Sequence, residues 1–166
     1  EAAFDGSAPA QASLASTHAF ALFVARYTAA GEVAWARVAA ESDDILRNPG
    51  LAAGADDSVA LVSTFWDVTT LDPSGIAASI SPTSAQDGLF LQWDGDGTFA
   101  WARRVSGPDM QQLGSVAAGT DLSWSVLGIA SGTLTWNAGG PDASSATTTA
   151  GGGADTFVLR LIHGSP

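Results

Sequence analysis

The sequence predicts an all-β protein built from a repeated antiparallel unit. Three observations support this prediction: a recurring hairpin pattern, side chains that alternate between apolar and polar along it, and glycine-containing turns at matching positions. Residues 23–37 and 89–103 are two copies of one pattern, 66 residues apart, and residues 157–161 begin a third copy. Repetition at a fixed spacing indicates that each copy is one structural unit, which buries its apolar faces against its neighbours.

Each copy of the recurring pattern is expected to form a β-hairpin. In the second copy, Leu89, Leu91 and Trp93 fall on one face of a strand, as two-residue alternation requires. The Asp-Gly-Asp-Gly segment at 94–97 has the residue types that a tight reversal needs. In the first copy, Gly31 occupies the matching turn.

A second hairpin accompanies the first in each unit. Residues 52–62 match residues 117–127, with a Gly, an Asp and a Ser at equivalent positions. Because its Ala-Ala-Gly segment is small, the strand at 51–54 suits an innermost position where backbones crowd together. The strands expected in one complete unit, from the innermost outward, are 51–54, 59–65, 89–93 and 99–104. Four short antiparallel strands per repeat, joined by Gly and Asp turns, predict the blades of a β-propeller.

The least regular stretches lie between the second and third strands of a unit. Residues 72–86 and 137–154 are rich in Ser, Thr, Gly, Pro and Ala, which predicts surface loops. Phe4 matches Leu71 and Trp136, and all three are expected to close a second strand. We place the units, within a single segment covering 1–166, at approximately 1–38 (partial), 50–105 (complete) and 114–162 (partial).

The length of the chain predicts an incomplete propeller. At about 67 residues per unit the chain holds about two and a half units, whereas closed propellers contain about four to eight. Unpaired strand edges and exposed apolar faces favour association. We therefore expect the chain not to be a stable monomer alone, and we expect its partners to be other copies of itself or the remainder of a longer propeller chain.

The combined pattern resembles the bacterial seven-bladed β-propeller repeat family. The resemblance depends on Phe-Val-Ala-Arg-Tyr at 23–27, a turn, Trp-Ala-Arg at 35–37, and Ala-Ala-Gly-x-Asp at 52–56 followed by an apolar strand. It covers nearly the whole chain, from about residue 4 to about residue 162. It implies a propeller in an extracellular or bacterial cell-surface setting, and it implies no catalytic residues.

Composition excludes several classes of function. Hydrophobic residues make up 46% of the chain and charged residues 14%, which is typical of a packed domain and not of a disordered one. No apolar run approaches the roughly 18 residues that a membrane-spanning helix needs. The formal net charge is −11, so the surface should repel nucleic-acid phosphates. The chain has no cysteine and therefore no disulfide.

Residues that differ between the copies are the candidates for function, because residues present in every unit are explained by packing. Trp66 and Trp136 are candidate ligand-binding residues, since an exposed indole can stack on a sugar or anchor a protein; packing within the fold is the alternative. Asp94 and Asp96 are closely spaced carboxylates that predict either a calcium site or an ordinary hairpin turn. Apart from this calcium alternative, no cofactor is expected.

The sequence offers no recognisable catalytic constellation. His18 and His163 are the two histidines, and neither has a Cys, a Glu or a second His at metal-ligand spacing. No phosphate-binding glycine loop or nucleophile elbow is present. The predicted function is non-enzymatic: an extracellular propeller segment that acts as a structural scaffold or assembly module. The alternative is a module that recognises a glycan or a surface protein through its loops and an exposed Trp.

Overall fold

A computed structural model describes residues 2–4, 12–44, 46–72, 75, 77–137, 144–147 and 153–162. The regular elements in these residues are all strands, which confirms the all-β prediction. The strands are β1 (Ala2–Phe4), β2 (Ala12–Leu14), β3 (Phe20–Tyr27), β4 (Val33–Ser42), β5 (Leu46–Ala53), β6 (Val59–Phe65), β7 (Thr69–Leu71), β8 (Ala78–Ile80), β9 (Asp87–Trp93), β10 (Phe99–Ser106), β11 (Gln111–Ala118), β12 (Trp124–Ser131), β13 (Thr133–Trp136), β14 (Ser144–Thr147) and β15 (Ala154–Leu161). The described residues contain no helix, and therefore none that is long and apolar enough to cross a membrane.

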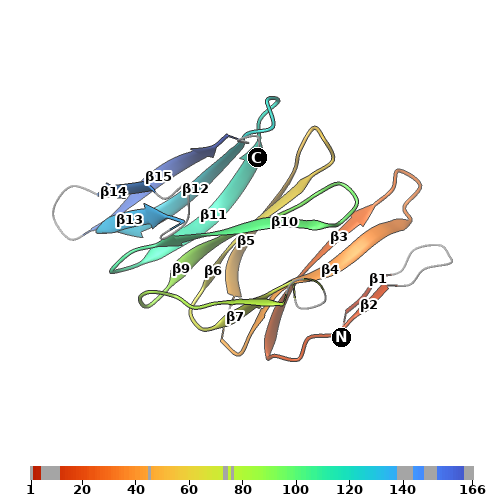
Figure 1. The fold of residues 1–166 in the computed structure, drawn as a ribbon, viewed down its shortest axis with the longest axis horizontal. Coiled ribbons are helices and arrows are strands. Elements are labelled where there is room, and N and C mark those ends of the chain that lie inside the picture. Colours follow the sequence, from red (N-terminus) through yellow and green to blue (C-terminus); the bar gives the residue numbers. More distant parts are fainter. Residues whose placement is uncertain are drawn as a thin grey trace.

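The strands form three large antiparallel sheets, none of which is closed, and one separate pair (Figure 1). The first sheet has the order β3-β4-β7-β8, the central sheet has the order β14-β13-β10-β9-β6-β5, and the third sheet has the order β11-β12-β15. β1 pairs with β2. The central sheet contains β5, β6, β9 and β10 as consecutive neighbours, which is the strand order that the repeat predicts.

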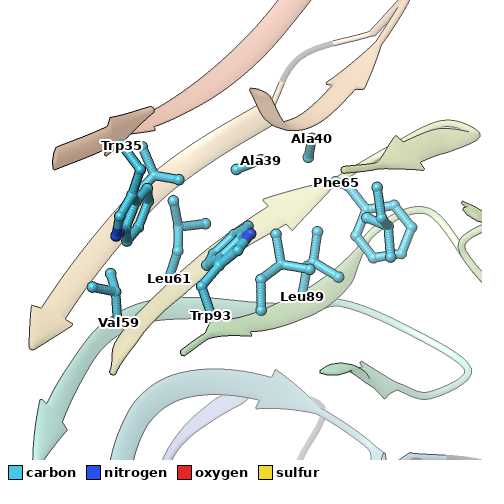
Figure 2. Packing of buried hydrophobic residues seen from close by; sticks show 11 residues of the cluster. Trp35, Ala39, Ala40, Val59, Leu61, Phe65, Leu89 and Trp93 are labelled. Atoms are coloured by element: carbon cyan, nitrogen blue, oxygen red, sulfur yellow. The ribbon is translucent and has the colours of Figure 1, made fainter. Parts of the chain in front are cut away.

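The two middle strands of the central sheet are buried on both faces. β6 and β9 are buried along their whole length, because the first sheet covers one face and the third sheet covers the other. Leu89 and Leu91 belong to the core against the first sheet, whereas Phe90 between them belongs to the core against the third sheet. Figure 2 shows the first of these cores, in which Trp35 from β4 lies near Leu61 from β6. The three sheets therefore stack face to face in chain order.

The predicted hairpin turns are confirmed at two repeat-equivalent positions. Gly31 and Gly97 both have left-handed backbones, with φ of 83° and 84°. In the second turn the N–H of Asp94 donates to the carbonyl of Thr98 over 2.9 Å, and the first turn has an equivalent bond of 2.8 Å. A left-handed φ favours glycine because a side chain would clash with the backbone. The repeated glycine is thus explained by the turn.

The repeated Gly-x-Asp-x-Ser motif also builds a turn. Oδ1 of Asp56 accepts hydrogen bonds from the N–H and the hydroxyl of Ser58, over 3.2 and 2.5 Å. Asp121 and Ser123 form the same pair of bonds in the third sheet. A Cβ on Gly54 would lie 2.4 Å from the Ser58 hydroxyl, so the turn leaves no room for a side chain there.

The prediction of surface loops at 72–86 and 137–154 is wrong for part of each stretch. The first contains β8, and the second contains β14 and the first residue of β15. The β7–β8 hairpin extends the first sheet at β4, and the β13–β14 hairpin extends the central sheet at β10. These strands have only three or four residues and are rich in Ser, Thr and Ala, so they carry no apolar alternation that a pattern search could detect.

The expectation that Leu71 and Trp136 close a second strand is also wrong. Leu71 lies in β7 and pairs with Ala40, and Trp136 lies in β13 and pairs with Val105. In both cases the chain leaves its own sheet and pairs with the outermost strand of the preceding sheet. Phe4 lies in β1, which is the first strand of the equivalent hairpin. Its side chain and the predicted loop residues 138–143 and 148–152 lie outside the described parts of the structure.

Candidate functional site

A groove of about 280 Å³ lies where the end of β3 faces the central sheet. One wall includes Ala25 and Tyr27 of β3, and the other includes Leu51 and Ala52 of β5 together with Val59 of β6. The groove is therefore mainly apolar. The two walls belong to the first and central sheets. In the repeat these sheets correspond to the central and third sheets, which pack together more closely through β5 and β11.

Leu51 in the groove is exposed, whereas its repeat equivalent is buried. Leu51 and Val116 occupy equivalent repeat positions, 65 residues apart, in β5 and β11. Val116 is 7% exposed because β11 packs against β5 and β6. Leu51 is 59% exposed because, among the strands that the structure describes, no inner strand of the first sheet lies beside it. The same apolar position is therefore covered at one junction between sheets and open at the other.

The edge of β3 bounds this groove. β3 pairs with β4 on one side and has no partner on the other side in the described residues. Its repeat equivalents, β9 and β15, each have a partner on that side, namely β6 and β12. An open edge presents unpaired backbone N–H and C=O groups, which are a template for pairing with another strand. The site thus combines an open edge with an adjoining apolar surface.

Arg26 closes the groove on its polar side. Its guanidinium lies 2.9 Å from Oδ1 of Asp57, at the turn between β5 and β6. It also donates a 2.6 Å hydrogen bond to the carbonyl of Gly95, which accepts a second bond of 3.0 Å from the indole of Trp35. These contacts join the first sheet to the central sheet and fix the distance between β3 and the β5–β6 turn.

A second candidate surface is the outer side of the third sheet. Its exposed apolar residues are Leu127 and Ile129 of β12 and Val158 of β15, with exposures of 45%, 41% and 67%. We call these three residues the open face. Val62 and Phe90, which match Leu127 and Val158 in the repeat, are completely buried because the third sheet covers them. The open face is therefore the repeat equivalent of a surface that is an interface in the same molecule.

The two predicted ligand-binding tryptophans lie in different settings. Trp66 directly follows β6 and is half-buried, and the guanidinium of Arg47 lies 5.5 Å from its ring centroid. Trp136 is only 5% exposed and packs edge-on against Phe90, with a centroid distance of 6.3 Å. Trp136 therefore contributes to the core between the central and third sheets and offers little surface to a ligand. The structure does not place the two indoles in one site.

Asp94 and Asp96 lie in the turn between β9 and β10. Oδ1 of Asp96 accepts a 2.8 Å hydrogen bond from the N–H of Thr98, and hydrogen bonding by Thr98 lowers the pKa of Asp96. Within the described ranges, no group of three or more His, Cys, Asp or Glu residues could hold a metal ion. The Asp96 carboxylate thus has a role in the turn, and the calcium alternative gains no further ligand.

A cluster around Glu41 was not predicted from the sequence. This buried carboxylate accepts hydrogen bonds from the hydroxyl of Ser16 (2.8 Å), the N–H of Thr17 (3.0 Å) and the hydroxyl of Thr17 (2.9 Å). Nδ1 of His18 lies 3.2 Å away. Burial raises the pKa of Glu41, but the hydrogen bonds from Ser16, Thr17 and His18 outweigh it, so the pKa lies below its ordinary value. Ser16, Thr17 and His18 are 23 to 25 positions away from Glu41 in the sequence, so no local motif marks the cluster.

The second repeat shows that this cluster is structural. Thr83, which is 66 residues after Thr17, donates its N–H and hydroxyl to the buried carboxylate of Asp87 over 2.8 and 3.0 Å. Burial is the main cause that raises the pKa of Asp87 above its ordinary value. A buried carboxylate thus binds the same threonine in both units, although it comes from a different strand each time. His163 lies outside the described residues.

Comparison with protein-family models and with curated proteins gave no match for this chain.

Proposed function

We propose that this chain is a non-enzymatic β-propeller segment that serves as a structural scaffold or assembly module outside the cell. Antiparallel sheets that recur along the chain and stack face to face support a propeller arrangement, as does the run of four consecutive strands β5, β6, β9 and β10 in the central sheet. The extracellular or bacterial cell-surface setting depends on the resemblance of the repeat to the bacterial seven-bladed β-propeller repeat family. The partners are further sheets of the same kind.

The open face carries this proposal. Leu127 and Val158 are exposed, whereas their repeat equivalents Val62 and Phe90 have no exposed surface. Complete burial of an apolar side chain of this size contributes about 1.5–3 kcal/mol relative to leaving it exposed. A further sheet that covers the open face, as the third sheet covers the central sheet, would gain this contribution at several positions.

Sedimentation of the purified chain over a wide concentration range tests the proposal. We expect the chain to associate, and we expect Leu127→Ser combined with Val158→Ser to weaken that association. Val68→Ser is the matched control, because Val68 is 50% exposed but lies between β6 and β7, away from the open face. A compact monomer at every concentration would contradict the assembly function.

Recognition of a glycan or a surface protein is the second candidate function, and it depends on Trp66. The half-buried indole and the Arg47 guanidinium beside it combine an aromatic surface with hydrogen-bond donors, and such residues are enriched in binding hot spots. Binding of polysaccharides to the wild type, to Trp66→Ala and to the neighbouring control Val68→Ala tests this function. It requires that Trp66→Ala loses binding without losing association; an effect on stability alone would contradict it.

A further inference from the structure

We infer that the edge of β3 and the adjoining groove form a strand-acceptor site for the β11–β12 hairpin of a second copy of this chain. In this strand exchange, β3 of one copy takes the place of β15 in the other. The inference depends on the proposed assembly function and names the partner and the contact. It accounts for the open edge and for the exposed Leu51 together.

The sequences of β3 and β15 support the exchange. Both contain Phe-Val-x-Arg, at 23–26 and at 157–160. β15 pairs antiparallel with β12 along its whole length, with Leu159 opposite Val126. Aligning the two Phe-Val-x-Arg segments places Ala25 of β3 opposite Val126 of the second copy. β3 therefore has the residue pattern that the edge of β12 already accepts.

The groove fits the rest of the hairpin. When β12 of the second copy pairs with β3, the hairpin places β11 next to β5, in the position that an inner strand of the first sheet would occupy. β11 and β5 already pack together at the junction between the central and third sheets. The same kind of contact would cover Leu51, as it covers Val116. Each junction would then contain a six-stranded sheet in the order β11-β12-β3-β4-β7-β8, which matches the repeat-equivalent order β5-β6-β9-β10-β13-β14 of the central sheet.

The donor is the β11–β12 hairpin because the other inner hairpin, β5–β6, is held within the central sheet. β6 pairs with both β5 and β9 and is buried on both faces, so releasing it would disrupt the central sheet. β12 pairs with β11 and with β15, and β15 lies at the edge of the described third sheet. Exchange between different ends of two copies is heterologous, so it produces rings or filaments of chains and not a two-fold dimer.

Engineered cysteines test the register, because the natural chain has none. One variant carries Ala25→Cys and the other carries Val126→Cys, and the two are mixed under oxidising conditions. We expect a disulfide-linked heterodimer, identified by peptide mapping, since Ala25 and Val126 become cross-strand neighbours. The matched control replaces Val126→Cys with Leu61→Cys. Leu61 is the repeat equivalent of Val126 in β6, and its partner strand β9 is held between β6 and β10 whereas β15 is an edge strand of the described third sheet, so no heterodimer should form.

A groove variant gives an independent check. Leu51→Glu places a charge in the groove at a side chain that is 59% exposed, so it should abolish the Ala25–Val126 cross-link while the chain stays folded, as measured by circular dichroism. Val68→Glu, at 50% exposure elsewhere, should leave the cross-link intact. Association without this cross-link, or equal cross-linking to Leu61→Cys, overturns the exchange but leaves the assembly function standing. Loss of all association overturns both.

Discussion

Phe90 is buried in the core between the central and third sheets, so replacing it measures how strongly these two sheets pack together. Its ring has no exposed surface and stacks on Trp101 with a centroid distance of 4.7 Å, and it packs edge-on against Trp124 and Trp136, each at 6.3 Å. Removing a buried Phe side chain costs about 3–5 kcal/mol, and each aromatic pair adds about 0.5–1.5 kcal/mol beyond burial. We expect Phe90→Ala to lower the free energy of unfolding by about 4 kcal/mol or more.

The internal repeat supplies the control for this prediction. Val158 is the equivalent of Phe90 in the third sheet, but it is 67% exposed, so Val158→Ala should change the free energy of unfolding by about 0.5 kcal/mol or less. Urea denaturation at fixed protein concentration, followed by tryptophan fluorescence, measures both variants, and Phe90→Leu provides a milder change should Phe90→Ala unfold. If Phe90→Ala and Val158→Ala differ by less than about 1 kcal/mol, the third sheet does not cover Phe90 and the stacking argument fails.

Two further predictions compare variants at paired positions: the buried carboxylates Glu41 and Asp87, and the turn glycines Gly31 and Gly97. The folded-state pKa of Glu41 lies below 4.5, so its ionised form stabilises the protein above that pH and this contribution is lost in acid. In urea titrations, Glu41→Gln should therefore lose less stability than the wild type below about pH 4.5. The pKa of Asp87 is raised above 3.8, which has the opposite sign, so Asp87→Asn should show a steeper loss than the wild type in the same series. Gly31→Ala and Gly97→Ala both place Ala at a left-handed φ, at a cost of about 1–2 kcal/mol, but only at Gly97 would the Cβ also lie 2.7 Å from the ring of Trp35. Thermal melts should therefore show a larger loss for Gly97→Ala, and equal losses would contradict the contact between the two sheets.

The sequence predicted the long strands well because their signals are local. Alternation in β9, the glycine turn at Gly97 and the Gly-x-Asp-x-Ser turns depend on residues close together in the chain, and the structure contains each of them. The short strands β8 and β14 could not be predicted in this way. They belong to hairpins whose first strands, β7 and β13, pair with the outermost strand of the preceding sheet, and that edge is supplied by residues distant in the sequence.

The candidate sites show the same division. Asp96 in its turn follows from local pattern, whereas the burial of Trp136 depends on packing against Phe90, a residue of another strand that is distant in the sequence. The open face was predictable only in general terms, as an exposed apolar surface of an incomplete repeat. Its residues were identified by comparing equivalent positions, Leu127 with Val62, under two different degrees of coverage.

The two short hairpins, β7–β8 and β13–β14, give the stack of sheets a direction. β7–β8 extends the sheet before its own, and β13–β14 does the same, so each sheet is joined to the preceding one by backbone hydrogen bonds as well as by apolar packing. Apolar faces alone would allow neighbouring sheets to slide or invert, because hydrophobic contact is non-directional. Strand pairing fixes register and orientation. A further sheet that follows the same rule joins the open face in one orientation, which is the head-to-tail arrangement that the exchange of β3 for β15 requires.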